Sequence, residues 1–189
     1  RLRVAGADLS RIFIIGSTRD ANGERQPFDP ATDIPALEYE AQRMGGVSLL
    51  IADPVVSAVT GDSHKNTEVR RALQPTVNLA ARLGAAILGI THFSKGSGGR
   101  EPLERVTGSI AFGALARIVM VTAKQAIDGD ENPKRLLARA KSNIGPDGGG
   151  FAYQLEQVDI EGMTASKVQW GGTLQGTARQ LLNVAETDE

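Results

Sequence analysis

The chain has 189 residues, a formal net charge of −1 and 41% hydrophobic residues, values that suit a soluble globular protein with one sizeable core. Cysteine is absent and there are two histidines, which excludes a disulfide framework and argues against thiolate or histidine-rich zinc sites. No apolar run approaches the ~18 residues of a membrane span, so we expect no membrane partner. The absence of cysteine is compatible with a reducing cytoplasm, which is the location we expect.

The first quarter of the chain predicts short elements separated by turn formers. Residues 2–9 are typical of the end of a helix, with Gly6 at its stop. A short strand is expected at residues 11–15, followed by a polar loop over residues 17–32. Asp33 is the expected cap of a helix over residues 33–44, with Pro35 tolerated in its first turn.

Residues 47–52, Val-Ser-Leu-Leu-Ile-Ala, form an apolar run that is typical of a strand buried on both faces of a parallel sheet. Pro54 cannot donate to a strand ladder, so Asp53 is expected at the C-terminal edge of the strand. Ligands bind at that edge of open α/β sheets. A carboxylate there suits Mg²⁺, although an Asp that caps the next turn would give the same pattern.

A second unit of helix and strand follows. Apolar residues recur along one face of residues 67–83 and predict a helix, which contains Pro75. Residues 85–90 predict a second buried strand that leads into Thr91 and His92. Strand ends share one edge in a parallel sheet, so Asp53 and His92 are expected within reach of one ligand. An ordinary surface histidine remains the alternative.

The rest of the chain is expected to contain a glycine-rich loop, a short helix, two strands, a hairpin around Glu161-Gly162 and a closing helix. These elements are assigned to residues 96–105, 110–115, 117–123, 134–140, 151–158 with 163–170, and 177–184. Helices that alternate with buried strands predict an α/β fold with a mainly parallel sheet flanked by helices. We expect one domain over residues 1–189, with the C-terminal hairpin at residues 151–170 inside it.

Several motifs occur together in one order. They are Asp53-Pro54, Thr91-His92-Phe93-Ser94-Lys95-Gly96, Arg105-Val106-Thr107-Gly108-Ser109-Ile110-Ala111-Phe112 and Lys141-Ser142-Asn143-Ile144-Gly145-Pro146. This set resembles the later part of a RecA-like ATPase domain. The resemblance is greatest to plasmid and phage RepA-type hexameric replicative helicases and their AAA-like relatives, and more distant to DnaB-type helicases. It runs over about residues 1–185.

The resemblance implies a set of ATP-handling residues. Asp53 corresponds to the Walker B carboxylate that binds Mg²⁺, and His92 to the sensor that couples the γ-phosphate to the following loop. Arg117 corresponds to the arginine finger that acts on ATP held by the neighbouring subunit. Lys141 corresponds to a second basic residue at that interface, although an ordinary surface lysine is the alternative.

The resemblance also implies contacts with single-stranded DNA inside a ring, expected to be a homo-hexamer. Lys95, Arg100 and Arg105 belong to the loop that points into the channel, where basic groups follow the DNA phosphates. His64 lies in a second loop that is a weaker candidate for the channel. The alternatives are that Lys95 and Arg100 only solvate a mobile loop and that Arg105 forms an ion pair at a helix entry.

The sequence departs from the family pattern at the phosphate loop. Gly-x-x-x-x-Gly-Lys-Ser/Thr does not occur, and Gly-Lys is absent altogether. In the family this loop and the catalytic glutamate lie upstream, so we expect the chain to be the C-terminal two-thirds of an ATPase domain, inactive by itself. Asn143 replaces the DnaB-type arginine, which leaves the finger role to Arg117. The alternatives are a non-catalytic DNA-binding or assembly module and a RadA- or KaiC-like regulatory ATPase.

Overall fold

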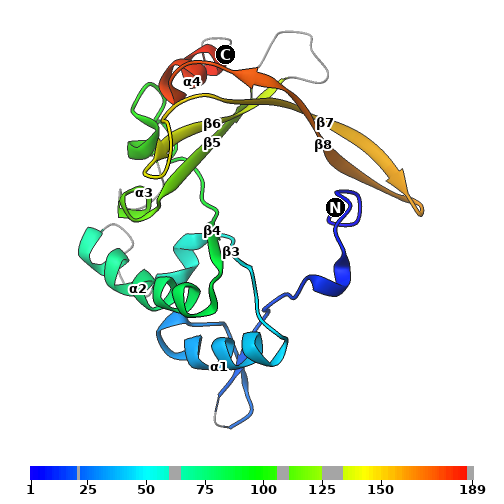
Figure 1. The fold of residues 1–189 in the computed structure, drawn as a ribbon, viewed down its shortest axis with the longest axis vertical. Helices are drawn as coiled ribbons and strands as arrows, with labels where there is room; N and C mark the ends of the chain where they lie inside the picture. Colours follow the sequence, from blue (N-terminus) through cyan, green and yellow to red (C-terminus); the bar gives the residue numbers. More distant parts are fainter. Residues whose placement is uncertain (21, 60–64, 106–110, 125–133, 187–189) are drawn as a thin grey trace. The chain divides into compact units, whose positions relative to one another are not determined.

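The computed structural model describes residues 1–20, 22–59, 65–105, 111–124 and 134–186, and the chain divides into two compact units. We call residues Ile14–Lys95 and Val106–Leu115 the helical unit, and residues Arg1–Phe13, Gly96–Arg105 and Ala116–Glu189 the sheet unit. The helical unit contains β1 (Thr18–Arg19), β2 (Arg25–Gln26), α1 (Pro30–Arg43), β3 (Leu49–Ala52), α2 (Asn66–Leu83), β4 (Ala86–Gly89) and α3 (Ala111–Leu115). The sheet unit contains β5 (Ile118–Lys124), β6 (Arg135–Ser142), β7 (Gly150–Ile160), β8 (Met163–Leu174) and α4 (Ala178–Glu186) (Figure 1).

Helix α1 begins earlier than the sequence predicts. Asp29 is the N-cap, because its carboxylate accepts from the Ala31 N–H at 2.8 Å and Pro30 follows at the first helical position. Asp33, the expected cap, lies one turn inside the helix and accepts from the Asp29 N–H at 2.8 Å. This hydrogen bond is the main cause of a lowered pKa at Asp33. The two aspartates therefore share the N-terminus of α1.

Helix α2 forms where its apolar periodicity predicts, with Pro75 inside it and Gly84 ending it in the left-handed conformation at φ 66°. Its buried side chains Val69 and Leu73 form a core cluster with Ala111 and Phe112 of α3. At its other end, Arg82 forms a two-pronged ion pair with Glu38 of α1, with N–O distances of 2.7 and 2.6 Å. Most of the buried core of the helical unit therefore lies between helices.

Strands β3 and β4 pair in parallel, as expected, from Leu49 opposite Ala86 to Ala52 opposite Gly89. The expectation that they are buried on both faces is wrong for these residues, because Ile51 is 59% exposed and Leu88 is 47% exposed. Among the described residues this sheet has two strands, and they do not cover both of its faces. An apolar run therefore indicates that a strand would be stabilised by burial, and it does not show that other parts of the chain bury it.

The larger sheet of the described residues is antiparallel, with the order β5-β6-β7-β8. The α/β class is confirmed, whereas the mainly parallel sheet is not seen in the described part of the chain. Parallel strands need a crossover of about a dozen residues or more. Here β7 and β8 are joined by Glu161 and Gly162 alone, which have φ of 51° and 79°. These angles suit a type I′ turn and confirm the predicted hairpin.

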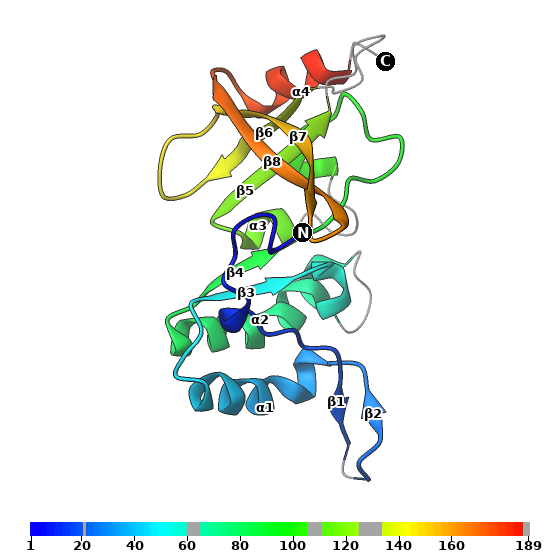
Figure 2. The same ribbon diagram turned by 90° about the vertical axis from the view of Figure 1, so that its right-hand side faces the viewer.

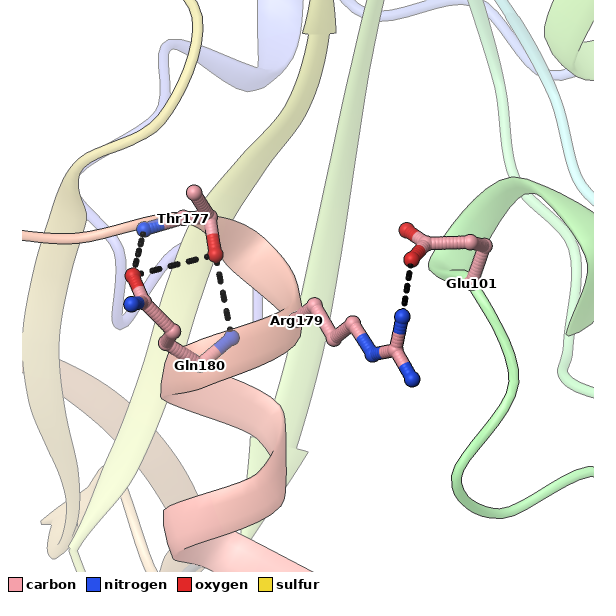
Figure 3. Close-up of polar contacts among 4 residues, drawn as sticks. All are labelled: Glu101, Thr177, Arg179 and Gln180. Atoms are coloured by element: carbon pink, nitrogen blue, oxygen red, sulfur yellow. Dashed lines mark hydrogen bonds and ion pairs between the residues drawn. The ribbon is translucent and has the colours of Figure 1, made fainter.

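Helix α4 covers one face of the antiparallel sheet by contacting β5 and β6 (Figure 2). Leu182 of α4 and Ala138 of β6 are 1% and 0% exposed. The helix begins with a capping box: Gln180 N–H donates to the Thr177 hydroxyl at 3.2 Å, and the Thr177 N–H donates to the Gln180 side-chain oxygen at 2.8 Å (Figure 3). The closing helix predicted from the sequence is thus confirmed.

The helix end predicted at residues 2–9 is present only as a turn over residues 2–6 and the 3-10 helix Leu9–Arg11, and the strand expected next to it is wrong. The Gly6 N–H donates to the Arg3 carbonyl and the Ala7 N–H to the Leu2 carbonyl, both at 3.0 Å, with Gly6 at φ 81°. This is the Schellman pattern of a helix C-terminus. Residues 12–16 form no strand, and Ile14 is 86% exposed. In the described part of the chain, the backbone of residues 12–16 takes part in none of the strand pairings.

No helix in the described ranges combines the length and the apolar character that crossing a membrane requires.

Candidate functional site

Asp53 and His92 follow the ends of the two parallel strands. The ladder continues past β4, because the Ile90 N–H donates to the Ala52 carbonyl at 2.9 Å and the Val55 N–H donates to the Ile90 carbonyl at 2.7 Å. These hydrogen bonds hold the backbone of Asp53 beside Ile90, with His92 two residues further on. Both side chains are exposed. The predicted common edge of the two strands is therefore present, within the helical unit.

Gly89 has a role at this edge that we did not predict from the sequence. A Cβ atom at this position would lie 3.0 Å from Cγ2 of Val55. Val55 begins the short 3-10 helix Val55–Ala58 directly after Asp53-Pro54 and packs against the core cluster of α2 and α3. The missing side chain lets this segment fold back over the end of β4. A glycine that ends an apolar run just before the polar segment is the only sequence signal for this contact.

A metal cation at this edge would be held by Asp53 together with groups of a bound substrate, such as phosphates. In the described parts of the chain, no cluster of three or more His, Asp or Glu side chains is arranged to hold a metal ion. Mg²⁺ does not need such a cluster, because it is usually held by one or two carboxylates and by substrate phosphates. An exposed carboxylate at the C-terminal end of a strand fits this mode of binding.

Arg117 and Lys141 come together at one end of the β5–β6 pair. The Lys141 ammonium group donates to the Ala116 carbonyl at 2.8 Å, and the Asn143 N–H donates to the Arg117 carbonyl at 2.8 Å. Lys141 is half-buried, whereas Arg117 is exposed at the start of an apolar strand. The pairing places two cationic side chains at the same corner of the sheet unit.

The three cations predicted in or beside the glycine-rich loop differ in their exposure to solvent. Lys95 and Arg100 are exposed, whereas Arg105 is only 8% exposed. Glu101, next to Arg100, forms an ion pair with Arg179 of α4, with a distance of 2.7 Å between the guanidinium nitrogen and the carboxylate oxygen (Figure 3). Both partners are about half exposed, so this pair contributes little to stability but holds the loop beside α4. Lys95 and Arg100 are therefore the more accessible cations.

The predicted site residues are divided between the two units. Asp53, His92 and Lys95 belong to the helical unit, and Arg100, Arg105, Arg117 and Lys141 belong to the sheet unit. His64 and residues 106–110, which include part of a quoted motif, lie outside the described residues. The structure thus brings together two groups, Asp53 with His92 and Arg117 with Lys141.

Comparison with known families bears on the first of these groups. A sequence profile described as an AAA domain matches residues 1–98, just over half of the chain. The chain belongs to the AAA domain family. This match includes β3 with Asp53 and β4 with His92, and it supports an ATPase-type domain of the AAA and RecA-like kind. Neither the curated proteins nor the solved structures contain a significant match.

Proposed function

We propose that the protein is part of an ATP-dependent, ring-forming DNA helicase or replication ATPase of the RepA type. The observation that carries the proposal is the pair of parallel strands inside the AAA domain match, with Asp53 and His92 following their C-terminal ends. A carboxylate beside a polarisable side chain at the C-terminal edge of parallel strands suits a magnesium nucleotide.

Each of the two residues has a defined role in this proposal. Asp53 holds Mg²⁺ directly or through water, so that the metal neutralises phosphate charge. His92 contacts the γ-phosphate and transmits its presence to the loop that begins at Lys95. The short link from His92 to Lys95 makes this coupling local, because only Phe93 and Ser94 separate the two residues.

Arg117 and Lys141 act in the proposal on a nucleotide held by the neighbouring copy of the chain. An exposed arginine next to a lysine offers two cations to the transferring phosphoryl group, whose charge grows toward the transition state. A finger that acts in trans requires assembly, so the active form is a homo-oligomeric ring, expected to be a hexamer. Lys95 and Arg100, with Arg105 and His64 as less accessible or weaker candidates, contact the phosphates of single-stranded DNA in its channel.

The first test is ATP hydrolysis with and without single-stranded DNA. The assay compares this 189-residue chain with a protein that also contains the sequence its reading frame encodes upstream. We expect turnover only in the longer protein, stimulated by DNA. Asp53→Ala and Arg117→Ala should each lower it by at least about 10³-fold, the scale measured for arginine fingers. Glu24→Gln, which changes an exposed carboxylate next to β2, is the matched control and should leave turnover unchanged.

Mixing the variants separates a role in cis from a role in trans. In mixed rings, an Asp53→Ala subunit still supplies Arg117 to its neighbour, so some activity should return when it is combined with an Arg117→Ala subunit. No turnover in either protein, together with retained DNA binding, would favour the non-catalytic module instead. The absence of Gly-Lys from these 189 residues favours that alternative. Turnover without strand separation of a forked duplex would point to a regulatory ATPase.

A further inference from the structure

Strand β3 has an exposed apolar face and an open edge. The parallel register places Ile51 beside Leu88 on this face, with Leu49 two residues before Ile51, and all three are about half exposed. In the part of the chain that the structure describes, β3 pairs with β4 alone. The backbone groups on its other side can therefore form a ladder with a further strand.

Residues 12–15 form a segment suited to such a ladder. Their sequence, Ile-Phe-Ile-Ile, consists of β-branched and aromatic residues, which favour strands. Among the described strand pairings none includes this segment, and Phe13, Ile14 and Ile15 are all more than half exposed. The chain thus presents an apolar strand without a sheet and an apolar sheet edge without a strand.

We propose that residues 12–15 of one copy of the chain pair antiparallel with β3 of a second copy. Alignment of Arg11 with Asp53 sets the register, because opposite charges directly across an antiparallel pair stabilise it. Both side chains are exposed, and neither forms an ion pair within the described ranges. A parallel alignment over the same stretch would place Arg11 beside the uncharged Ser48.

The apolar side chains match in the antiparallel register. Phe13 lies opposite Ile51, and Ile15 lies opposite Leu49, so both pairs form on the exposed face of β3. Aromatic and β-branched side chains that face each other across two strands are favourable pairs. Alternation sends the two remaining isoleucines of the segment to the other face, where the β3 side chains are less exposed.

The partner is a second copy, because the chain's own segment does not occupy this edge in the structure. The exchange is reciprocal: each copy contributes one segment and accepts one, which gives a closed pair with two identical contacts. A net charge of −1 opposes such self-association little. At concentrations below association, β3 stays as exposed as it is in the structure.

Sedimentation velocity of the 189-residue chain over a range of concentrations tests the pairing. We expect a reversible equilibrium between monomer and dimer. Phe13→Ser should weaken the dimer at least about tenfold, because an aromatic–aliphatic pair is lost at both contacts. Tyr39→Ser is the matched control, since Tyr39 is 65% exposed but lies on α1. A monomer at all concentrations, or a dimer that Phe13→Ser leaves unchanged, would overturn the proposal.

Charge variants test the register by the same measurement. Arg11→Glu places like charges opposite each other at both contacts and should weaken the dimer by about tenfold. Asp53→Lys should have the same effect. The two changes in one chain restore opposite charges and should return the dimer close to its original strength. Losses that add in the double variant would overturn the alignment of Arg11 with Asp53.

Cross-linking distinguishes a second copy from the chain's own segment. The chain has no cysteine, so chains with the single changes Ile15→Cys and Leu49→Cys can be mixed and treated with a short bis-maleimide. We expect a covalent dimer of the two variants, and none when Tyr39→Cys replaces Leu49→Cys. Cross-linking within one chain that carries both Ile15→Cys and Leu49→Cys, without covalent dimers, would overturn the exchange.

The outcomes separate this inference from the proposed function. The two proposals meet at Asp53, which cannot hold Mg²⁺ and face Arg11 at once. A dimer that responds to Phe13→Ser, without ATP turnover in the longer protein, would overturn the ATPase proposal alone. ATP turnover in the longer protein, together with a 189-residue chain that is monomeric at all concentrations, would overturn the strand exchange alone.

Discussion

The two units use apolar strands in different ways. In the helical unit, Ile51 and Leu88 lie on parallel strands and are 59% and 47% exposed, while the core lies between helices. In the sheet unit, Leu136 and Ala138 lie on an antiparallel strand and are 7% and 0% exposed beneath α4. An antiparallel sheet needs cover on one face only, whereas parallel strands are normally covered on both. The sheet unit therefore buries the one face that its antiparallel sheet must cover, whereas Ile51 and Leu88 on the parallel strands of the helical unit stay about half exposed.

Substitutions in the buried cores of the two units should have the largest effects on the free energy of unfolding. Leu79→Ala in α2 and Leu182→Ala in α4 should each lower the free energy of unfolding by about 2–5 kcal/mol, because each leaves a cavity at a site that is 0% or 1% exposed. Ile51→Ala should cost less than about 1 kcal/mol if the strand is as exposed in solution as in the structure. Urea denaturation followed by circular dichroism measures all three.

An Ile51→Ala chain destabilised as much as the Leu79→Ala chain would contradict this difference between the two units. Such a result would mean that the face of β3 is covered in solution, for instance by another copy of the chain. Repeating the measurement at several protein concentrations tells self-association from cover within one chain.

A smaller effect is expected at the N-terminus of α4. Thr177→Ala should lower the free energy of unfolding by about 1 kcal/mol, because it removes the side-chain oxygen that accepts from the Gln180 N–H. Gln180→Glu keeps the reciprocal hydrogen bond and places a negative charge at the helix start, so it should leave stability unchanged or raise it. Denaturation midpoints measure both. A Thr177→Ala chain as stable as the original would show that α4 does not depend on its cap.

The smallest effect concerns pH and the link between α1 and α2. The hydrogen bond from Arg82 lowers the pKa of Glu38 below its ordinary value. A lowered folded-state pKa adds stability above the unfolded pKa of about 4.3, and this stability is lost as the pH falls through the folded pKa. Glu38→Gln should therefore melt below the original chain at pH 7, with a difference that disappears at acid pH and shrinks in high salt. Glu40→Gln, which breaks a local pair with Arg43, is the control and should have less effect.

The sequence predicted those elements whose signals are local. The periodicity of α2, the stop at Gly84, the Glu161-Gly162 turn and the strand that ends at Asp53 all depend on neighbouring residues, and all are confirmed. In the larger sheet, the antiparallel pairing of β5 with β6 and of β6 with β7 was missed, because pairing direction depends on connection length rather than on apolar pattern. The cap of α1 was missed because Asp29 and Asp33 are both plausible caps, and only the hydrogen bonds distinguish them.

The candidate site was predictable in its parts. Two strand ends that carry Asp53 and His92 at one edge follow from the apolar runs and the parallel pairing. The placement of Arg117 and Lys141 at one corner depends on the pairing of β5 with β6, and the contacts of the Trp170 ring with those of Phe151 and Tyr153 depend on the register of β7 and β8. Register depends on contacts between residues far apart in the sequence, so residue patterns alone did not indicate either arrangement.

The hairpin of β7 and β8 extends well past the rest of its sheet (Figure 1). Strand β7 pairs with β6 only through residues 150–153, so residues 154–160 extend roughly 20 Å as a two-stranded ribbon. Such a ribbon is marginal by itself in water. The tip of the ribbon contacts the first turn of the chain. Arg3 in this turn forms an ion pair with Glu161, and Val4 is 9% exposed. The outer end of the ribbon is therefore not isolated: it is in contact with residues at the start of the chain, through an exposed ion pair that by itself contributes little to stability.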